Sequence, residues 1–353
     1  MRGKKLSIKP LNVEEIEREE VQTVLNEYFQ DPLLEEIERN TRGFLNVCWK
    51  VKLKKGNFFL RRYRVGIKKD RIVFEHSLIQ HLNKKNFTKI PKLLQTLNNK
   101  TFVERFVGQR KLFYALFEYA EGEDRYVWDR PNCSDVELKN AAKTLAEYHA
   151  FIYEFKPKYK EGPLIDKLIL QYRRKIMKLK PRRRSMFETL LFNHKDKILK
   201  EINLVYELLK KSSYNALPRI VIHGDFHLGN MKFINDEVTA LFDFDWARIE
   251  TRAYDVAMAL LYNCSKWEER RNPIDLHKLT LFLDAYEEKL KNLKMSWWRL
   301  SGKECTLIPI LIRAANLYLI DWACDDFYNK KVNDKEYYRY LKHNLNIIEW
   351  FNE

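Results

Sequence analysis

The order of hydrophobic and polar residues predicts strands and two helices in the first third of the chain and mainly helices after it. An approximate 3.6-residue repeat over residues 12–30 indicates an amphipathic helix. An apolar stripe over residues 71–82 predicts a second helix. Short β-like runs predict two pairs of strands, and Gly56 and Asn57 favour a hairpin turn within the first pair. The four runs are 44–53, 58–64, 101–107 and 111–119.

Helical patterns dominate from residue 134 onward. Ser134 precedes an apolar repeat that extends to Ile152, and Glu137 stands three residues after it, as in a capping box. Residues 156–217 have a helical but irregular pattern, which three prolines interrupt. Three more helices are predicted: 253–261, one opened by Asn272-Pro273, and 308–327.

One stretch, Val221–Ala247, interrupts this helical part with three short apolar runs. The runs are Arg219–Ile222, Met231–Ile234 and Val238–Phe242, and the first and third end in loops that carry carboxylates. We interpret them as strand ends that present acids. His223, Asp225 and Asn230 follow the spacing H-x-D-x-x-x-x-N of a kinase catalytic loop, and Asp243 comes after a hairpin-like insert.

The chemistry of phosphoryl transfer explains these residue types. The reaction needs a carboxylate that orients the attacking hydroxyl and accepts its proton, and we expect Asp225 to do this. It also needs oxygen ligands that hold Mg²⁺ against the phosphates, which the Asn230 amide and the Asp243 carboxylate offer. Taken alone, the spacing arises often by chance, and an Asp at a strand end is usually a turn former.

The whole constellation resembles a known family. HGDFHLGN, followed by LFDFDWARIETRAYDVA, is similar to the signature of the aminoglycoside phosphotransferase and choline kinase superfamily. Within this superfamily, LFEYAEGEDRYVW followed by a LAEYHA helix resembles homoserine kinase type II and spore-coat kinase-like members more than antibiotic-modifying ones. The resemblance implies an α+β, bilobal protein kinase-like fold, with a small antiparallel lobe over residues 1–119 and a helical lobe over 120–353. It also implies ATP and Mg²⁺ as cofactors, Asp243 as the metal-binding Asp, and Asp255 as a brace for the catalytic loop.

The same resemblance assigns nucleotide contacts to the first lobe. Gly43–Val47 stands at the phosphate loop, although it has a single glycine. The basic residue of the third strand is Arg61 in place of the usual Lys, and Glu75 on the next helix is its partner. Strand alternation places Arg61 and Arg62 on opposite faces. An ordinary surface pair is the alternative for Arg61 and Glu75.

A hinge segment completes the predicted nucleotide site. The run FYALFEYAEGE resembles the kinase hinge, where the backbone of Glu118 and Ala120 would contact adenine and Phe117 would lie behind it. An edge strand without a ligand is the alternative.

Composition narrows the class of protein further. The net charge of +16 favours anionic ligands such as ATP, but it also attracts nucleic acid or acidic lipid without selecting among them. The basic cluster at 172–184 is typical of a solvated helix face, so nucleic acid is a minor alternative. Five scattered cysteines argue against a disulfide framework, and the lack of an 18-residue apolar run predicts a cytoplasmic protein with no membrane span.

We therefore predict an ATP-dependent kinase whose partner is a small-molecule hydroxyl acceptor: an amino alcohol, an amino acid, a sugar or an aminoglycoside. The alternative is a protein kinase or a nucleotide-binding pseudokinase, but Asp255 follows Asp243 by only twelve residues, which leaves little room for a peptide-docking loop. Asp321 and Asp325 are weaker candidates for a cationic substrate, and the roles of His227 and Asp245 stay open. His149 is expected in the core.

Overall fold

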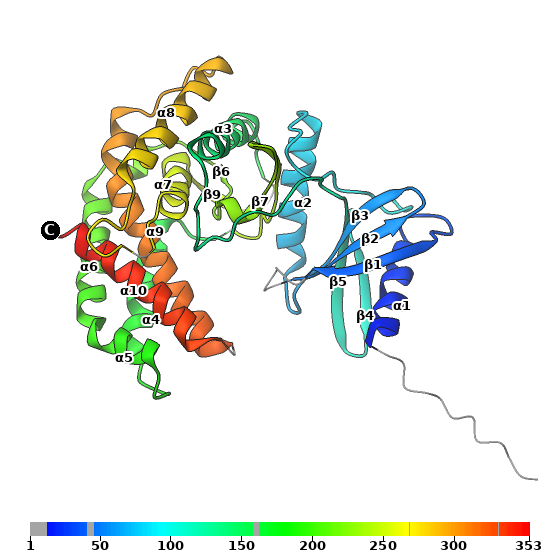
Figure 1. Ribbon diagram of the computed structural model, residues 1–353, viewed down its shortest axis with the longest axis horizontal. Coiled ribbons are helices and arrows are strands. Elements are labelled where there is room, and N and C mark those ends of the chain that lie inside the picture. The colour runs from blue at the N-terminus through cyan, green and yellow to red at the C-terminus, as the bar shows by residue number, and fades with distance from the viewer. Residues whose placement is uncertain (1–12, 41–45, 158–161, 268, 331) are drawn as a thin grey trace, which may run out of the picture. The chain divides into compact units, whose positions relative to one another are not determined.

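A computed structural model describes residues 13–40, 46–157, 162–267, 269–330 and 332–353. The chain forms two compact units (Figure 1). The first unit comprises the described residues up to Gln80 and the segment Pro91–Ala120, and the second comprises His81–Ile90 and Glu121–Glu353.

The first unit is built on a five-stranded antiparallel sheet in the order β1-β2-β3-β5-β4. Its strands are β1 (Leu34–Asn40), β2 (Val47–Leu53), β3 (Gly56–Arg62), β4 (Val103–Val107) and β5 (Arg110–Glu118). The helices α1 (Val13–Leu25) and α2 (Lys69–Lys84) accompany the sheet. The predicted elements of this region are therefore present.

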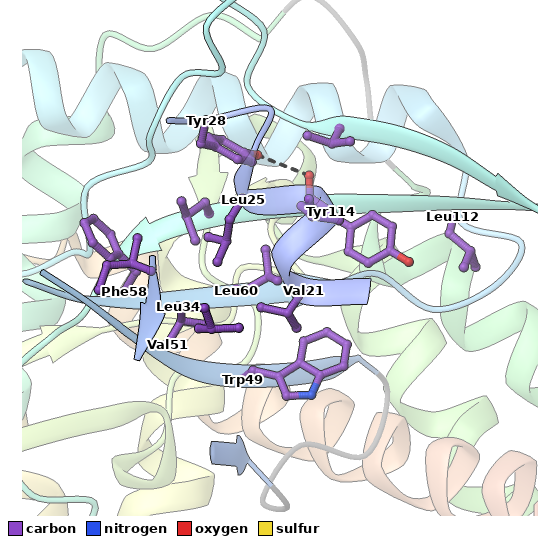
Figure 2. Packing of buried hydrophobic residues seen from close by; sticks show 14 residues of the cluster. Val21, Leu25, Tyr28, Leu34, Trp49, Val51, Phe58, Leu60, Leu112 and Tyr114 are labelled. Atoms are coloured by element: carbon purple, nitrogen blue, oxygen red, sulfur yellow. Dashed lines mark hydrogen bonds between the residues drawn. The ribbon is translucent and has the colours of Figure 1, made fainter. Parts of the chain in front are cut away.

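The core of the first unit lies between α1 and one face of the sheet (Figure 2). Val21 and Leu25 of α1 pack against Trp49 and Leu60 of the strands, and all four are fully buried. Because side chains alternate along a strand, Arg61, the neighbour of Leu60, lies on the other face. The α1 side of the sheet thus holds the apolar core, and Arg61 lies on the opposite side.

One detail of the first unit differs from the sequence prediction, and another prediction falls partly outside the described residues. Strand β1 was not predicted, because LEEIERN buries only Leu34 fully and exposes its acidic residues at the sheet edge. The proposed phosphate loop lies partly outside the described residues, which begin again at Asn46.

The second unit is mainly helical (Figure 1). Its helices are α3 (Asp135–Ile152), α4 (Ile165–Lys178), α5 (Met186–Asn193), α6 (Lys195–Lys211), α7 (Arg252–Asn263), α8 (Leu276–Asn292), α9 (Gly302–Asn329) and α10 (Asp334–Trp350). The capping box of α3 is confirmed: the Ser134 hydroxyl accepts from the Glu137 amide at 3.2 Å, and the Glu137 carboxylate accepts from the Ser134 amide at 2.9 Å.

Two small antiparallel sheets lie among these helices. Strand β6 (Arg219–Ile222) pairs with β9 (Arg248–Thr251), and β7 (Met231–Ile234) pairs with β8 (Glu237–Leu241). Asn235 has φ 52° in the predicted hairpin between β7 and β8, a conformation that Asn tolerates. The runs predicted as strands thus surround the loop 223–230.

Several boundaries in the second unit depart from the prediction. Helix α8 does not begin at Asn272-Pro273, because Asp275 caps the helix and accepts from the amides of His277 and Lys278. Neither β9 nor α10 was predicted. Helix α9 begins at its own capping box, Ser301 with Glu304, earlier than the apolar pattern indicated.

Helix α9 is long and apolar enough to cross a membrane by length and composition. However, 78% of its most apolar 18-residue window is buried inside the second unit. This burial is typical of a core helix, and α9 packs against α7 and α10.

Candidate active site

The loop after β6 contains a glycine that no other residue can replace without movement. Gly224 has φ 75°, in the left-handed region that favours glycine. A Cβ atom at this position would lie 2.4 Å from the backbone oxygen of Trp246. Gly224 therefore lets the loop 223–230 lie directly against the segment that leads into β9.

The first turn of α7 holds the start of this loop. The Asp255 carboxylate accepts from the amides of His223 at 2.8 Å and Gly224 at 2.9 Å. His149 of α3 contacts the same carboxylate at 3.1 Å and the Tyr286 hydroxyl at 2.7 Å. Burial alone would raise the pKa of Asp255, but His149, His223 and the loop amides outweigh it and lower the pKa. The bracing role of Asp255 and the core position of His149 are confirmed.

The last turn of α7 holds the other half of the loop. The Tyr262 hydroxyl donates to Oδ1 of Asp225 at 2.9 Å. The Asn263 side chain accepts from the Leu228 amide at 3.1 Å and donates to the Phe226 oxygen at 3.3 Å. These contacts were not predicted. A polar pair seven and eight residues after Asp255, on the same face of an apolar helix, is the signal that could have found them.

Asp225 is held by several donors and stays partly open to solvent, with 16% of its side chain exposed. The Asn230 amide nitrogen donates to the Asp225 backbone oxygen at 2.9 Å and to Oδ2 at 3.2 Å, and His227 Nε2 lies 3.5 Å from Oδ2. Burial favours the neutral acid, yet His227, His223 and Tyr262 outweigh it and lower the pKa of Asp225. Asp225 is therefore a fixed carboxylate that is ionised at neutral pH.

Backbone hydrogen bonds bring Asp243 next to this loop. The Phe242 amide donates to the Asn230 oxygen at 3.1 Å, and the Phe242 oxygen lies 3.2 Å from His223 Nε2. Phe242, the residue before Asp243, therefore contacts both ends of the loop, His223 and Asn230. Asp243 itself has φ 66°, which turns the chain sharply after β8.

Asn230 and Asp243 fit the requirements of a magnesium ion. The Asn230 nitrogen faces Asp225, so the oxygen of this planar amide points the other way. An amide oxygen and a carboxylate on adjoining segments are hard oxygen ligands of the kind Mg²⁺ prefers. The donor set thus suits the ion that the sequence predicts.

His223, predicted as a catalytic residue, lies fully buried beneath the loop. Its Nδ1 accepts from the Asp225 amide at 3.3 Å, so the proton of the neutral ring sits on Nε2 and is donated to the Phe242 oxygen. Burial lowers the pKa of His223, against the opposing effect of Asp255 and Asp225. These bonds suit a residue that positions Asp225.

In the first unit, Arg61 and Glu75 form a buried ion pair. Arg61 Nη1 donates to Glu75 Oε1 at 2.9 Å. The Tyr63 hydroxyl donates to Glu75 Oε2 at 3.0 Å, which fixes the carboxylate from its other side. The neighbouring Arg62 pairs with Glu20 of α1 instead, so the predicted alternation is confirmed. Burial, with a smaller effect of Arg61, lowers the pKa of the adjacent His76 to about 3.

The predicted hinge residues lie at the end of β5. Phe117 is buried, and the Arg61 guanidinium lies 5.8 Å from the centroid of its ring. The Glu118 amide donates to the Lys92 oxygen at 2.9 Å. Ala120 follows at the boundary of the unit and is half-buried. Contacts of these residues with adenine stay a prediction.

A sequence profile of the phosphotransferase enzyme family matches residues 36–288, well over half of the chain. The chain belongs to this family. The family, the α+β kinase-like fold and the phosphotransferase class predicted from the catalytic loop are confirmed.

The relatives and solved structures that resemble this family member are small-molecule kinases by name. A homoserine kinase of Polaromonas naphthalenivorans is 32% identical over 117 residues, which cover 33% of the chain and about a third, 34%, of that relative. A homoserine kinase of Bartonella henselae is 25% identical over 296 residues, covering 81% of the chain and 80% of the relative.

Two solved structures share the fold at low sequence identity. The amicoumacin kinase hAmiN, in complex with AMP-PNP, Ca²⁺ and Ami, has a TM-score of 0.67 at 14% identity and covers 96% of this chain and 94% of its own. A microcompartment-associated aminopropanol kinase has a TM-score of 0.62 at 12% identity and covers 94% and 95%. At these identities the likeness shows the fold alone.

The structure also shows the surroundings of the weaker site candidates of this phosphotransferase, which are Asp321, Asp325, His227 and Asp245. Lys175 Nζ donates to Asp321 at 2.8 Å and to Asp325 at 2.5 Å, so one lysine binds both carboxylates. This pairing offsets one of the two negative charges at α9. His227 lies beside Asp225, and Asp245 is buried after Asp243, so both adjoin the loop without a decided role.

Proposed function

We propose that this phosphotransferase uses ATP and Mg²⁺ to phosphorylate a hydroxyl group of a small molecule. The observation that carries the proposal is the state of Asp225: an ionised carboxylate, partly exposed, and fixed by Tyr262 and Asn230. A fixed carboxylate of this kind can orient a hydroxyl and receive its proton.

The proposed transfer forms one bond to the γ-phosphorus and breaks another. The acceptor oxygen forms a bond with the γ-phosphorus, the bond from that phosphorus to the β–γ bridging oxygen breaks, and ADP leaves. The hydroxyl proton passes to Asp225. Asn230 and Asp243 would hold Mg²⁺, which supplies positive charge to the phosphate oxygens when bound. His223 keeps the Asp225 amide in place from below.

In the first unit, we assign Arg61 to the ATP phosphates and Glu75 to holding Arg61. Glu75 holds the guanidinium through its Nη1 atom, and a planar fork suits phosphate oxygens. Glu118 and Ala120 would bind adenine through their backbone groups, with Phe117 behind the base. These roles rest on the family resemblance and on the observed ion pair.

A small acceptor is favoured over a protein. The named relatives act on homoserine, and only twelve residues separate Asp243 from Asp255, so the α7 helix begins where a peptide-docking loop would need space. A basic nucleic-acid surface is less favoured, since Arg182 and Arg183 lie over the rings of Tyr328 and Phe327. A cytoplasmic location is part of the same proposal.

The proposal is tested by measuring ATP consumption with a panel of amino alcohols, hydroxy amino acids, sugars and aminoglycosides. Asp225→Asn is the blank, and Asp236→Asn, an exposed carboxylate in the β7–β8 turn, is the matched control. We expect Asp225→Asn to lower transfer by about 100-fold or more while ATP still binds. Transfer that persists in Asp225→Asn, or that no hydroxyl compound stimulates in the unaltered protein, would contradict the proposal.

A further inference from the structure

Arg248, at the start of β9, is a buried cation whose Nε and Nη2 atoms, one edge of the guanidinium, have no hydrogen-bond partner among the described residues. The residue is 7% exposed. Leaving buried donors unpaired is unfavourable, so such atoms in a folded protein call for an explanation. A ligand that binds there is one.

Two other buried arginines of the same unit show what this edge binds. Arg252 holds Glu304 through Nε at 2.6 Å and Nη2 at 2.9 Å. Arg313 holds Glu201 through the same two atoms, each at 2.7 Å. In both, the pair of N–H groups on one side of the guanidinium grips a carboxylate. Arg248 presents this pair of atoms without a carboxylate from the described chain.

The surroundings of Arg248 add two further unpartnered hydroxyl groups. The hydroxyls of Tyr172 and Tyr254 are both buried and, among the described residues, neither makes a hydrogen bond of normal geometry, although a looser contact with Arg248 opposes the rise that burial causes in the pKa of Tyr254. The Tyr254 ring centroid lies 5.2 Å from the Arg248 guanidinium. Burial raises the pKa of Tyr172, and Arg248 opposes the shift, so the Tyr172 hydroxyl is close enough to feel the cation. Both hydroxyls remain protonated and can donate to an anion.

This cluster adjoins the catalytic loop. Nη1 of Arg248 lies 3.5 Å from the position that a Cβ of Gly224 would occupy, and Gly224 immediately precedes Asp225. Tyr318 of α9 connects the two sites, since both Asp225 and Arg248 influence its pKa, which burial raises. An anionic group bound to Arg248 would therefore place the rest of its molecule beside the Asp225 loop.

We propose that the Nε and Nη2 edge of Arg248 binds the carboxylate of the phosphoryl acceptor, which makes the acceptor a hydroxy acid or hydroxy amino acid. The inference rests on the proposed function and narrows it. Tyr172 and Tyr254 supply additional donors to the same carboxylate. Sugars, aminoglycosides and simple amino alcohols lack this group and leave the buried cation unpaired.

Asp321 extends the site toward an amino acid. Its Oδ2 atom binds Lys175, whereas its buried Oδ1 atom has no hydrogen-bond partner in the described part of the chain. Tyr172 is influenced by Asp321 as well as by Arg248, so both charges lie around this hydroxyl. An acceptor with an ammonium group next to its carboxylate would find an acceptor atom for it there.

The experiment compares acceptors that differ only by the carboxylate. The pairs are homoserine with 3-aminopropan-1-ol, serine with ethanolamine, and threonine with 1-aminopropan-2-ol, each assayed for phosphorylation by the full chain with ATP and Mg²⁺. For the pair whose amino acid is phosphorylated best, we expect kcat/KM of the amino acid to exceed that of the matching amino alcohol by at least about 100-fold. A site built for a charged group rejects an analogue that lacks this group. Equal or greater transfer to the amino alcohols would overturn the inference and leave the kinase proposal standing. No transfer to any hydroxyl compound would remove the kinase proposal itself.

A variant then assigns the preference to Arg248. Arg248→Met should abolish the preference for the carboxylate member, mainly by raising its KM, whereas Arg174→Met, which removes an exposed positive charge two residues after Tyr172, should retain it. Since Arg248 pairs with no described carboxylate, Arg248→Met should keep its Tm, unlike Arg313→Met, which leaves Glu201 buried and unpaired. A preference unchanged in Arg248→Met, or a fall in Tm as large as that of Arg313→Met, would show that Arg248 is a structural residue.

Discussion

The hydroxyl of Tyr262 donates a hydrogen bond of 2.9 Å to Oδ1 of Asp225, from the last turn of the helix whose first turn braces the same loop. Asp255 and Tyr262 are seven residues apart, two helical turns, so both lie on one face of α7. One rigid helix therefore fixes both the backbone and the carboxylate of the loop.

Tyr262→Phe should make the enzyme more sensitive to acid. The hydroxyl lowers the pKa of Asp225, so its removal raises this pKa, and protonation then turns transfer off at a higher pH. We expect the acid limb of the kcat/KM profile to move to higher pH and kcat to fall by about 10-fold. Tyr148→Phe removes an equally buried hydroxyl, which donates to the Val221 oxygen at 3.1 Å, and should leave the limb in place. An unmoved limb in Tyr262→Phe would contradict this role.

Two substitutions separate the contribution of the Asp243 carboxylate from that of its backbone conformation. Asn tolerates positive φ and keeps one side-chain oxygen, whereas Ala loses the ligand and adopts φ 66° at a cost of about 1 kcal/mol. We expect Asp243→Asn to weaken Mg·ATP binding with little change in Tm, and Asp243→Ala to weaken binding and also lower Tm. Calorimetric titration with Mg·ATP and thermal unfolding measure the two effects. Unchanged affinity in both variants would exclude Asp243 as a metal ligand.

Asp321 should give the protein a pH-dependent stability between pH 4 and 6. Burial raises the pKa of Asp321 to about 6, although Lys175 opposes the shift. The folded state therefore binds a proton that the unfolded chain does not bind in this window, and the free energy of unfolding falls as pH rises through it.

Asp321→Asn removes that loss of stability. The difference in Tm between this variant and the unaltered protein should increase in favour of the variant from pH 5 to pH 8. The corresponding change in the free energy of unfolding is at most about 2 kcal/mol. Asp325→Asn, which removes the half-exposed carboxylate bound to the same lysine, should show no such trend. A difference in Tm that does not vary with pH would refute the assignment.

The sequence predicts those helices, strands and loops whose signal lies within a few consecutive residues. Ser134 with Glu137 specifies the start of α3 because a capping box is formed by four consecutive residues. The loop from His223 to Asn230 is likewise identified by local spacing. Strand β9 is only four residues long and is defined by its pairing with β6, which no local pattern of RIET reveals.

The residues missed around the site have the same physical origin. Tyr262 and Arg248 carry no motif, and their importance comes from which atoms they meet after folding. The Tyr262 hydroxyl matters because it donates to Asp225. The Nε and Nη2 atoms of Arg248 matter because no described residue accepts a hydrogen bond from them. Spacing from Asp255 could have identified the first, whereas the second requires coordinates.

A Cβ atom on Gly224 would lie only 2.4 Å from the Trp246 oxygen, and this close approach ties two properties of the enzyme that could otherwise vary separately. Any side chain there would push the chain at Trp246 away, and with it the neighbouring start of β9, where we propose that the acceptor carboxylate binds. Efforts to redirect the enzyme toward new alcohols should therefore leave position 224 untouched and work from α4, whose Tyr172 hydroxyl lies near Arg248.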